Sequence, residues 1–192
     1  QANLLAGGPA YATEAARTTA IPSPFEGQRA YITGSTVTAA TGTTTAVPTG
    51  IQSIYNGAAW TTVTPVGAYS NTSASTASTT YVNTLTSDGT AISVTLATGT
   101  TALLTLSANA TNATVGAAAW MTFAVSGATT VAAADAQGIG VNIPAASYSV
   151  TLSRTFVYTG LTAGTNTFTL NYRTGSGTVV FAGRNLVVQA VA

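Results

Sequence analysis

The strongest constraint on the fold is a strict alternation of apolar and polar side chains near the C-terminus. Leu152, Phe156 and Tyr158 share one parity, and threonine or serine occupies Thr151, Ser153 and Thr155. Residues 167–172 repeat the alternation, with phenylalanine, leucine and tyrosine on one parity. Successive side chains of a strand leave opposite faces, so each run predicts a half-buried strand. With turns at Gly160–Gly164 and Gly175–Gly177, this end of the chain is predicted to be an antiparallel meander.

Shorter strand patterns fill the middle of the chain. The expected strands are Tyr81–Thr86, Ala91–Ala97, Thr101–Ala108, Ala118–Val125 and Thr129–Ala134, followed by a looser loop at Ala134–Ser147. Ile92, Val94 and Leu96 are expected to point inward, as are Met121, Phe123 and Val125. Eight or nine short strands with glycine turns and almost no helix predict an all-β chain, best interpreted as a jelly-roll-like β-sandwich over residues 67–192.

Residues 1–66 are predicted to form a separate N-terminal arm and hairpin anchoring module. Tyr11–Arg17 is the one stretch with helical character, and Arg29–Thr33 is expected to be a strand. Asn56-Gly57 lies between the apolar runs Ile51–Tyr55 and Ala59–Val63, a pattern that predicts a hairpin with a type I′ turn.

The composition narrows the possible functions. Charged residues are 5% of the 192, with no histidine, no cysteine and a net charge of +1. Without lysine or a basic patch, no nucleic-acid binding is expected. Without histidine and cysteine, Ser-His or Cys-His catalysis and transition-metal sites lose their usual groups, so we expect neither an enzyme nor a cofactor. No apolar stretch reaches the length of about 18 residues that a membrane helix needs, so no membrane insertion is expected.

Two weaker chemical interpretations concern the carboxylates. Asp88 and Asp135 are the candidate pair for a glycosidase site in the predicted sandwich, against the simpler interpretation that each satisfies amides in a turn. Asp135–Asn142 carries oxygen ligands among glycines, as a calcium loop does, but a loop that bends at glycine is favoured.

Low charge predicts an oligomer or a component of a larger assembly, because few surface charges keep copies apart. Arg154, Arg173 and Arg184 all lie on the C-terminal strands. They are candidates for a cluster around a symmetry axis or for partners of Asp135, although the favoured interpretation is that each caps an exposed strand edge.

Aromatic residues supply the remaining candidate contacts. Tyr55 and Trp60 are expected near the end of the hairpin, as possible interface or glycan contacts. Trp120, Tyr69 and Tyr148 are further candidates for stacking on sugar rings. For Trp120, which lies in an apolar strand pattern, a place in the core or a subunit interface is favoured.

Two segments carry a resemblance to a known group of proteins. The pattern P-x-P-x-E-G-Q-x-A-Y at residues 22–31, followed by Y-N-G-A-A-W at residues 55–60, resembles a recurring segment of bacteriophage tail and head-surface proteins. Ser153–Arg173 resembles the closing strands of their jelly-roll domains. The long uncharged loop Thr36–Gly50 departs from that pattern, because relatives often have a short acidic turn there.

The resemblance implies a non-enzymatic protein on the exterior of a phage particle. It would be a capsid decoration protein or head fibre, or a minor tail or tail-fibre component, and a homotrimer attached to other virion proteins through its N-terminal arm. The alternative is a carbohydrate-binding β-sandwich module, either receptor-binding or secreted, that recognises a host surface glycan.

Overall fold

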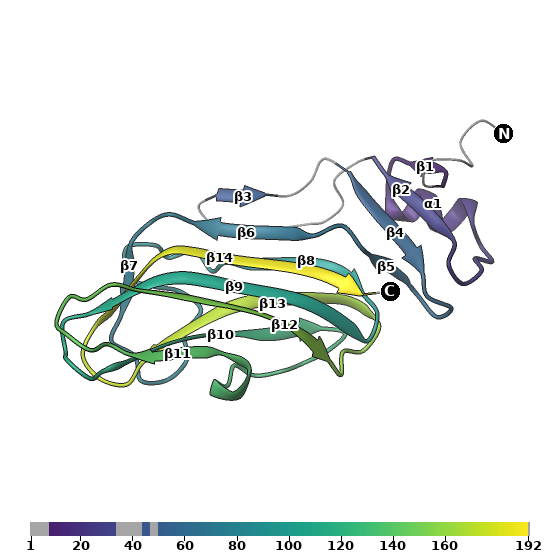
Figure 1. Ribbon diagram of the computed structural model, residues 1–192. Helices are drawn as coiled ribbons and strands as arrows, with labels where there is room; N and C mark the ends of the chain where they lie inside the picture. The colour runs from purple at the N-terminus through teal and green to yellow at the C-terminus, as the bar shows by residue number, and fades with distance from the viewer. Residues whose placement is uncertain (1–7, 34–43, 47–49, 192) are drawn as a thin grey trace.

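A computed structural model of the chain describes residues 8–33, 44–46 and 50–191. Its regular secondary structure is almost entirely strand, as predicted (Figure 1). In chain order the elements are β1 (Ala10–Tyr11), α1 (Glu14–Ala20), β2 (Arg29–Ile32), β3 (Thr44–Ala46), β4 (Ile51–Tyr55), β5 (Trp60–Thr62), β6 (Val66–Ser70), β7 (Ala74–Thr76), β8 (Ser93–Thr98), β9 (Thr101–Asn112), β10 (Ala118–Gly127), η1 (Asp135–Gln137), β11 (Ile139–Asn142), β12 (Val150–Thr159), β13 (Gly164–Thr174) and β14 (Val179–Val191).

Eight of these strands form a jelly roll. One sheet, called sheet C below, has the order β12-β9-β14-β6-β3, and β7 also pairs with β14. The facing sheet, called sheet B, has the order β11-β10-β13-β8. The antiparallel pairs β6–β14, β8–β13, β9–β12 and β10–β11 join the first strand of the set to the last, the second to the seventh, and so on inward. This nested pairing is that of a long hairpin rolled into two sheets, which is the jelly-roll arrangement.

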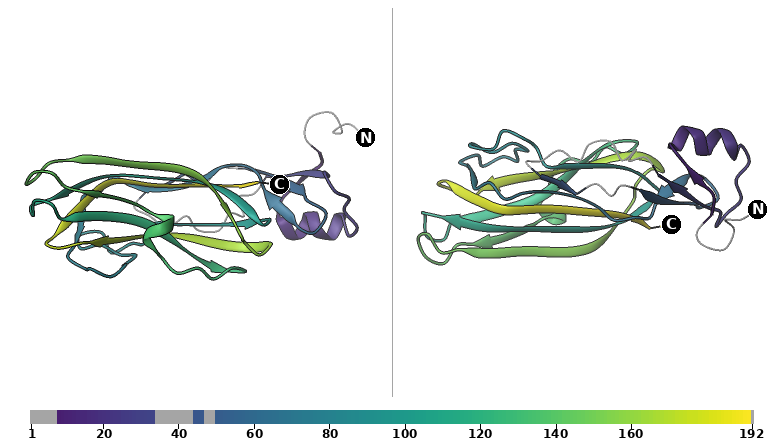
Figure 2. Two further views of the ribbon diagram at one scale, coloured as in Figure 1. Left: turned by 60° about the horizontal axis from the view of Figure 1, so that its bottom comes forward. Right: turned by 90° about the horizontal axis from the view of Figure 1, so that it is seen from above.

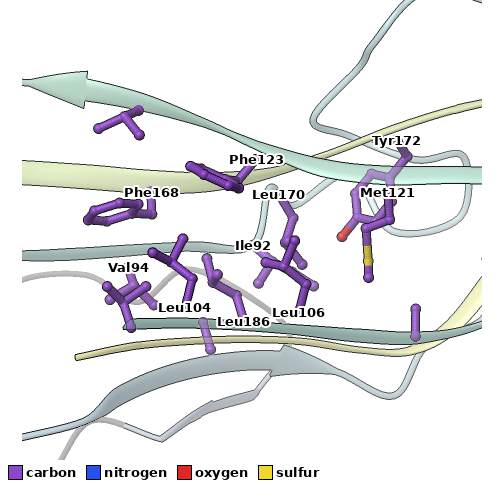
Figure 3. Close-up of a cluster of buried hydrophobic side chains, with 14 of the residues drawn as sticks. Ile92, Val94, Leu104, Leu106, Met121, Phe123, Phe168, Leu170, Tyr172 and Leu186 are labelled. Atoms are coloured by element: carbon purple, nitrogen blue, oxygen red, sulfur yellow. The ribbon is translucent and has the colours of Figure 1, made fainter. Parts of the chain in front are cut away.

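The core lies between sheets B and C. Figure 3 shows Phe123, Phe168 and Leu170 from sheet B meeting Leu104 and Leu186 from sheet C. These side chains are buried because each occupies the inward parity of its strand. The predicted inward sets, Ile92-Val94-Leu96 and Met121-Phe123-Val125, are all buried and are therefore confirmed.

The predicted C-terminal meander is wrong. Strands β12 and β14 belong to sheet C, whereas β13 between them belongs to sheet B. The chain therefore crosses from one sheet to the other between successive strands. Each of these strands pairs with strands far away in the sequence, as β12 does with β9. Alternation fixes which side chains are buried, but it does not say which strand is the partner.

Three local predictions in the middle of the chain are also wrong. Residues 81–86 and 129–134 make only isolated bridges, for example between Val82 and Tyr172 and between Val125 and Val131. Conversely, the expected loop Ala134–Ser147 contains the edge strand β11, whose four residues pair with the start of β10.

The N-terminal residues form a small sheet of their own, with the order β1-β2-β4-β5. With α1 it lies beyond one end of the sandwich, near the C-terminus, in all three views (Figures 1 and 2). The helix begins at Glu14, later than predicted, because the Thr13 side chain caps it by accepting a hydrogen bond from the Ala16 amide. Tyr11 instead belongs to β1, which runs parallel to β2.

The predicted hairpin of β4 and β5 is confirmed, but its turn is not type I′. Tyr55 pairs with Trp60, so four residues form the loop. The Asn56 side chain accepts hydrogen bonds from the amides of Ala58 and Ala59, and only Gly57 has a positive φ, at 89°. These two hydrogen bonds stabilise the four-residue turn, which needs only one residue with a positive φ.

The division of the chain at residue 66 stays a prediction. The small sheet is built from residues 10–62, but β3, from the same part of the sequence, pairs with β6 of sheet C. Strand β5 also lies against β8. Most of the loop Thr36–Gly50, with the departure noted there, falls outside the described residues.

Candidate interaction surfaces

The most deeply buried charged group is Arg184 on β14, whose residue is 0% exposed. Its guanidinium forms an ion pair with Asp88, whose side chain is 6% exposed. Ser70 joins them: its hydroxyl donates to Asp88 at 2.6 Å and accepts from Arg184 at 3.0 Å. Asp88 does lie in a turn, where its amide donates to the Leu85 carbonyl, but its side chain is also the partner of a buried arginine. The favoured interpretation of Arg184 as a cap of an exposed strand edge is wrong. Instead, Arg184 ties the connection between β7 and β8 to the interior.

A β-bulge aims Arg184 inward. The register between β14 and β9 shifts between Ala182 and Asn185, and Gly183 has a φ of 57°. Phe181 is buried before the bulge and Arg184 after it, so the inward parity changes from odd to even at this point. Bulges commonly re-aim a side chain in this way.

A second charged cluster lies on the outward side of sheet B. Arg173 on β13 forms a two-pronged ion pair with Asp135, with nitrogen–oxygen distances of 3.0 and 2.5 Å. The Tyr81 hydroxyl donates to the same carboxylate at 2.6 Å. The Arg173 guanidinium lies 5.1 Å from the centre of the Trp120 ring and 5.4 Å from that of Tyr81. Of the alternatives left open for Arg173, the one in which it receives Asp135 is therefore the one observed.

The electrostatics of this cluster follow from its contacts. Hydrogen bonds from Arg173 hold the pKa of the Asp135 carboxyl below its ordinary range, and that carboxylate raises the pKa of Arg173. Burial, followed by the bond to Asp135, raises the pKa of Tyr81. Trp120 packs closely on β11, where a Cβ on Gly140 would come within 2.4 Å of the indole. The cluster therefore fastens the loop at Asp135 and Tyr81 onto the sheet, and Trp120 is partly buried within it.

Arg154 is the third predicted arginine, and it does lie on an edge strand, β12. Its guanidinium donates to the Gly138 carbonyl at 2.5 Å and lies 4.5 Å from the centre of the Phe156 ring. Gly138 directly precedes β11, the edge strand of the other sheet, so Arg154 bridges the open side of the sandwich. The three arginines thus have three separate sets of partners and do not form the single cluster considered from the sequence.

Together these contacts use every charged side chain of residues 66–191. The sequence there has two carboxylates and three arginines. Arg184 pairs with Asp88, Arg173 pairs with Asp135, and Arg154 binds a backbone carbonyl. The sandwich therefore presents a surface with almost no uncompensated charge.

Sheet C presents an uncharged outward face. Rows of outward side chains run across its strands, such as Thr155–Thr105–Val187 and Val157–Leu103–Gln189, as the registers give them. Val157 is 59% exposed, and Leu103 and Val187 are partly exposed. Among the described strands of this sheet, no outward side chain carries a charge.

The predicted hairpin aromatics bind their own module. Tyr55 and Trp60 meet edge to face, with ring centroids 5.6 Å apart. Arg17 from α1 lies 4.5 Å from the centre of the Trp60 ring and donates to the Ser53 hydroxyl at 3.1 Å. Burial lowers the pKa of Arg17. Arg17 thereby pins the helix to the small sheet.

The end of the sandwich opposite the N-terminal module carries a set of uncharged loops, called the distal tip below: residues 113–117, 143–149 and 175–178. Asn112, which is buried, connects all three. Its side-chain oxygen accepts a hydrogen bond from the Thr114 amide, and its backbone carbonyl accepts one from the Ser147 amide. Its side-chain amide group donates to the Ser176 carbonyl. Tyr148, a candidate sugar-stacking residue, is 55% exposed there.

The described residues bring few chemically active groups together. Asp88 and Asp135, the candidate carboxylate pair, each bind a different arginine. No three or more metal-ligating side chains gather within the part of the chain that the structure describes. None of its described helices is long and apolar enough to cross a membrane.

Sequence reasoning gave neither Tyr81 nor Asn112 the role that the structure shows. Tyr81 was assigned to a strand, although its hydroxyl bonds a carboxylate 54 residues away. Asn112 ends β9 with the same parity as the buried Ala108 and Ala110, and that inward position of a polar residue was a usable signal.

Comparisons with known proteins add little to this geometry. No protein-family model and no curated protein sequence matches the chain. Similar solved structures include the infectious bursal disease virus Gx strain, with 10% identity, 73% of this chain and 41% of that chain covered, and a TM-score of 0.44. Eiger TNF from S. frugiperda has 11% identity, with 53% of this chain and 65% of that chain covered, and a TM-score of 0.38.

A third similar structure is the carbohydrate-binding module CBM6cm-2 from Cellvibrio mixtus lichenase 5A in complex with cellotriose. It has 12% identity, with 64% of this chain and 98% of that chain covered, and a TM-score of 0.29. The chain spans less than two thirds of the first two neighbours and nearly all of the third. With TM-scores below 0.5, these neighbours do not indicate a function for the chain.

Proposed function

We propose that this chain is a non-enzymatic structural protein on the exterior of a bacteriophage particle, where it acts by packing its jelly roll against neighbouring proteins. The observation that supports this most is that four of the five charges of the sandwich are paired with each other and the fifth, on Arg154, binds a backbone carbonyl. A surface with so little unpaired charge has little to desolvate when it is buried, so forming an interface costs less.

The arrangement of the N-terminal module and the sandwich along the molecule suits such a role. The N-terminal module, pinned by Arg17 and Trp60, lies at one end and serves as the attachment to other virion proteins. The sandwich then extends away from the attachment point. The phage assignment itself rests on the sequence resemblance at residues 22–31, 55–60 and 153–173.

The test is fractionation of a lysate from cells that produce both the particle and the chain. An antibody against the chain should detect it in the density-gradient band of intact particles and on their outside. Detection only among free proteins, or only after particles are opened, would refute the proposal. Hundreds of copies per particle would indicate capsid decoration or a head fibre, and a few to dozens would indicate a tail component.

A second candidate function, binding of a neutral host glycan, is favoured by the distal tip. Tyr148 offers an exposed aromatic face among hydroxyl-bearing, uncharged loops that Asn112 holds in place. Aromatic stacking with fixed polar groups is the usual chemistry of sugar recognition. The full chain and a Tyr148→Ala variant should be compared on a glycan array; binding that disappears in the variant supports this candidate, and no binding by the full chain excludes it.

A further inference from the structure

The outward sides of the two sheets differ in how far they are exposed to solvent. The outward side of sheet B is covered in part by its own chain: Thr122 points outward but is 0% exposed, and its hydroxyl donates to the Ala134 carbonyl in the covering loop, whereas Ser126 and Thr165 on the same side stay exposed. The outward side chains of β9, β12 and β14, in contrast, are all at least partly exposed. Sheet B also carries the Arg173–Asp135 ion pair on its outward side, so sheet C offers the more open and uncharged face to a partner.

We propose that the outward face of sheet C packs against the same face of a second copy of this chain. This inference rests on the proposed function, since it names the partner that buries the neutral surface. The absence of charge favours a copy as the partner, because a face without charges offers no complementarity to a charged protein and no repulsion to itself.

The size of the face is sufficient for a homotypic contact. Strands β12, β9 and β14 have 10, 12 and 13 residues, and the five-residue β6 lies alongside. At about 3.3 Å per residue and about 4.8 Å between strands, their common face projects to about 550 Å². Two copies would bury about 1,100 Å², and more once side-chain relief is included, close to the lower limit of about 1,200 Å² for specific interfaces.

The face also has the chemistry of an interface core. Val157 lies opposite Leu103, and Val187, which lies opposite Thr105, is the diagonal neighbour of Leu103, so the three form an oblique apolar strip over three strands. Threonine and serine surround it, as in the row of Thr105 and Thr155, whose hydroxyls are already bonded to each other at 2.9 Å. Hydroxyls that are satisfied within their own sheet can be buried with little loss.

A face that packs on its own copy makes an isologous contact, which closes at two copies. The arrangement therefore differs from the homotrimer implied by the resemblance, and the oligomeric state separates the two. Sedimentation equilibrium of the full chain, from about 1 to about 100 µM, should give twice the 19.0 kDa of one chain. A monomer across this range, or a species of three chains, would overturn the proposal.

A matched pair of variants locates the contact. Val157→Arg places a charge on the face, and Val115→Arg places the same charge on the distal tip; the two valines are 59% and 62% exposed, so neither variant should unfold the protein. We expect Val157→Arg, and likewise Val187→Arg, to weaken dimerisation at least about tenfold, whereas Val115→Arg leaves it unchanged. Equal effects of Val157→Arg and Val115→Arg would refute the proposed face.

Antibody detection on particles separates this inference from the proposed function. If the chain is found on the particle but remains monomeric in solution, the function stands and the partner is wrong. If it dimerises through sheet C but is missing from the particle, the contact between copies stands and the proposed place on the particle is wrong.

Discussion

Replacing Asp88 by asparagine tests the buried ion pair that holds the connection between β7 and β8. The substitution keeps the size of the side chain but leaves Arg184 charged inside the protein, where its Nε and Nη1 have no hydrogen-bond partner among the described residues. Its remaining bonds go to Ser70 and to the Thr72 carbonyl. Breaking one side of a buried pair costs about 3–5 kcal/mol.

That loss is large beside the 5–15 kcal/mol that is typical of a whole domain, so the variant is expected to be only marginally folded. With a urea m-value of about 2 kcal/mol/M, the unfolding midpoint should fall by about 2 M. The assay is urea denaturation followed by circular dichroism. Asp135→Asn is the matched control, because its carboxylate is 46% exposed and its ion pair should contribute less than about 1 kcal/mol.

A double-mutant cycle shows whether the pair acts as a unit. Arg184→Met alone leaves Asp88 charged and buried, whereas the double variant Asp88→Asn with Arg184→Met removes both charges. The double variant should therefore lose less stability than the sum of the single variants, by at least about 2 kcal/mol. A loss below about 1 kcal/mol for Asp88→Asn, or additive losses in the cycle, would refute this role of the pair.

Three further predictions concern other parts of the chain. Gly183→Ala should cost about 1–2 kcal/mol in thermal or urea unfolding, because φ is 57° at the bulge; Gly89→Ala, which meets nothing within 4 Å, is the control, and equal effects would contradict the reasoning. The pKa of Asp135 is lowered in the folded state, so its contribution is present above the unfolded pKa of about 3.9 and is lost as the pH falls below it. The stability difference between wild type and Asp135→Asn should accordingly shrink between pH 6 and pH 2, and a constant difference would count against the ion pair. Arg17→Met should speed amide hydrogen exchange in α1 about tenfold and leave the sandwich unchanged, whereas Arg29→Met, on the exposed side, should alter neither; unchanged exchange in α1 would show that Arg17 does not pin the helix.

Much of the core could be predicted from the sequence because burial follows local parity. Phe168, Leu170 and Tyr172 alternate with polar residues, and all three are fully buried. Pairing is a different matter, since it depends on strands that lie far apart in the chain. Leu152 of β12 faces Ala108 of β9 across the sheet, and nothing within either strand specifies the other.

The charged residues were harder to predict than the apolar ones. Arg184 follows a glycine that changes the parity of β14, and a pattern read without the bulge cannot show which way the arginine points. Arg173 could be placed with Asp135 only as one of several alternatives, because the loop that carries Asp135 folds back over the sheet. Tyr81 was out of reach, since its strand-like sequence gives no sign of a bond to that loop.

A cryo-electron microscopy map of the intact particle would test the central claim most directly. We expect density for the jelly roll on the outside of the particle, joined to it through the N-terminal module, with the outward face of sheet C buried against a second copy. A particle without this density, or a jelly roll whose sheet C and distal tip both face open solvent, would contradict the proposed packing role.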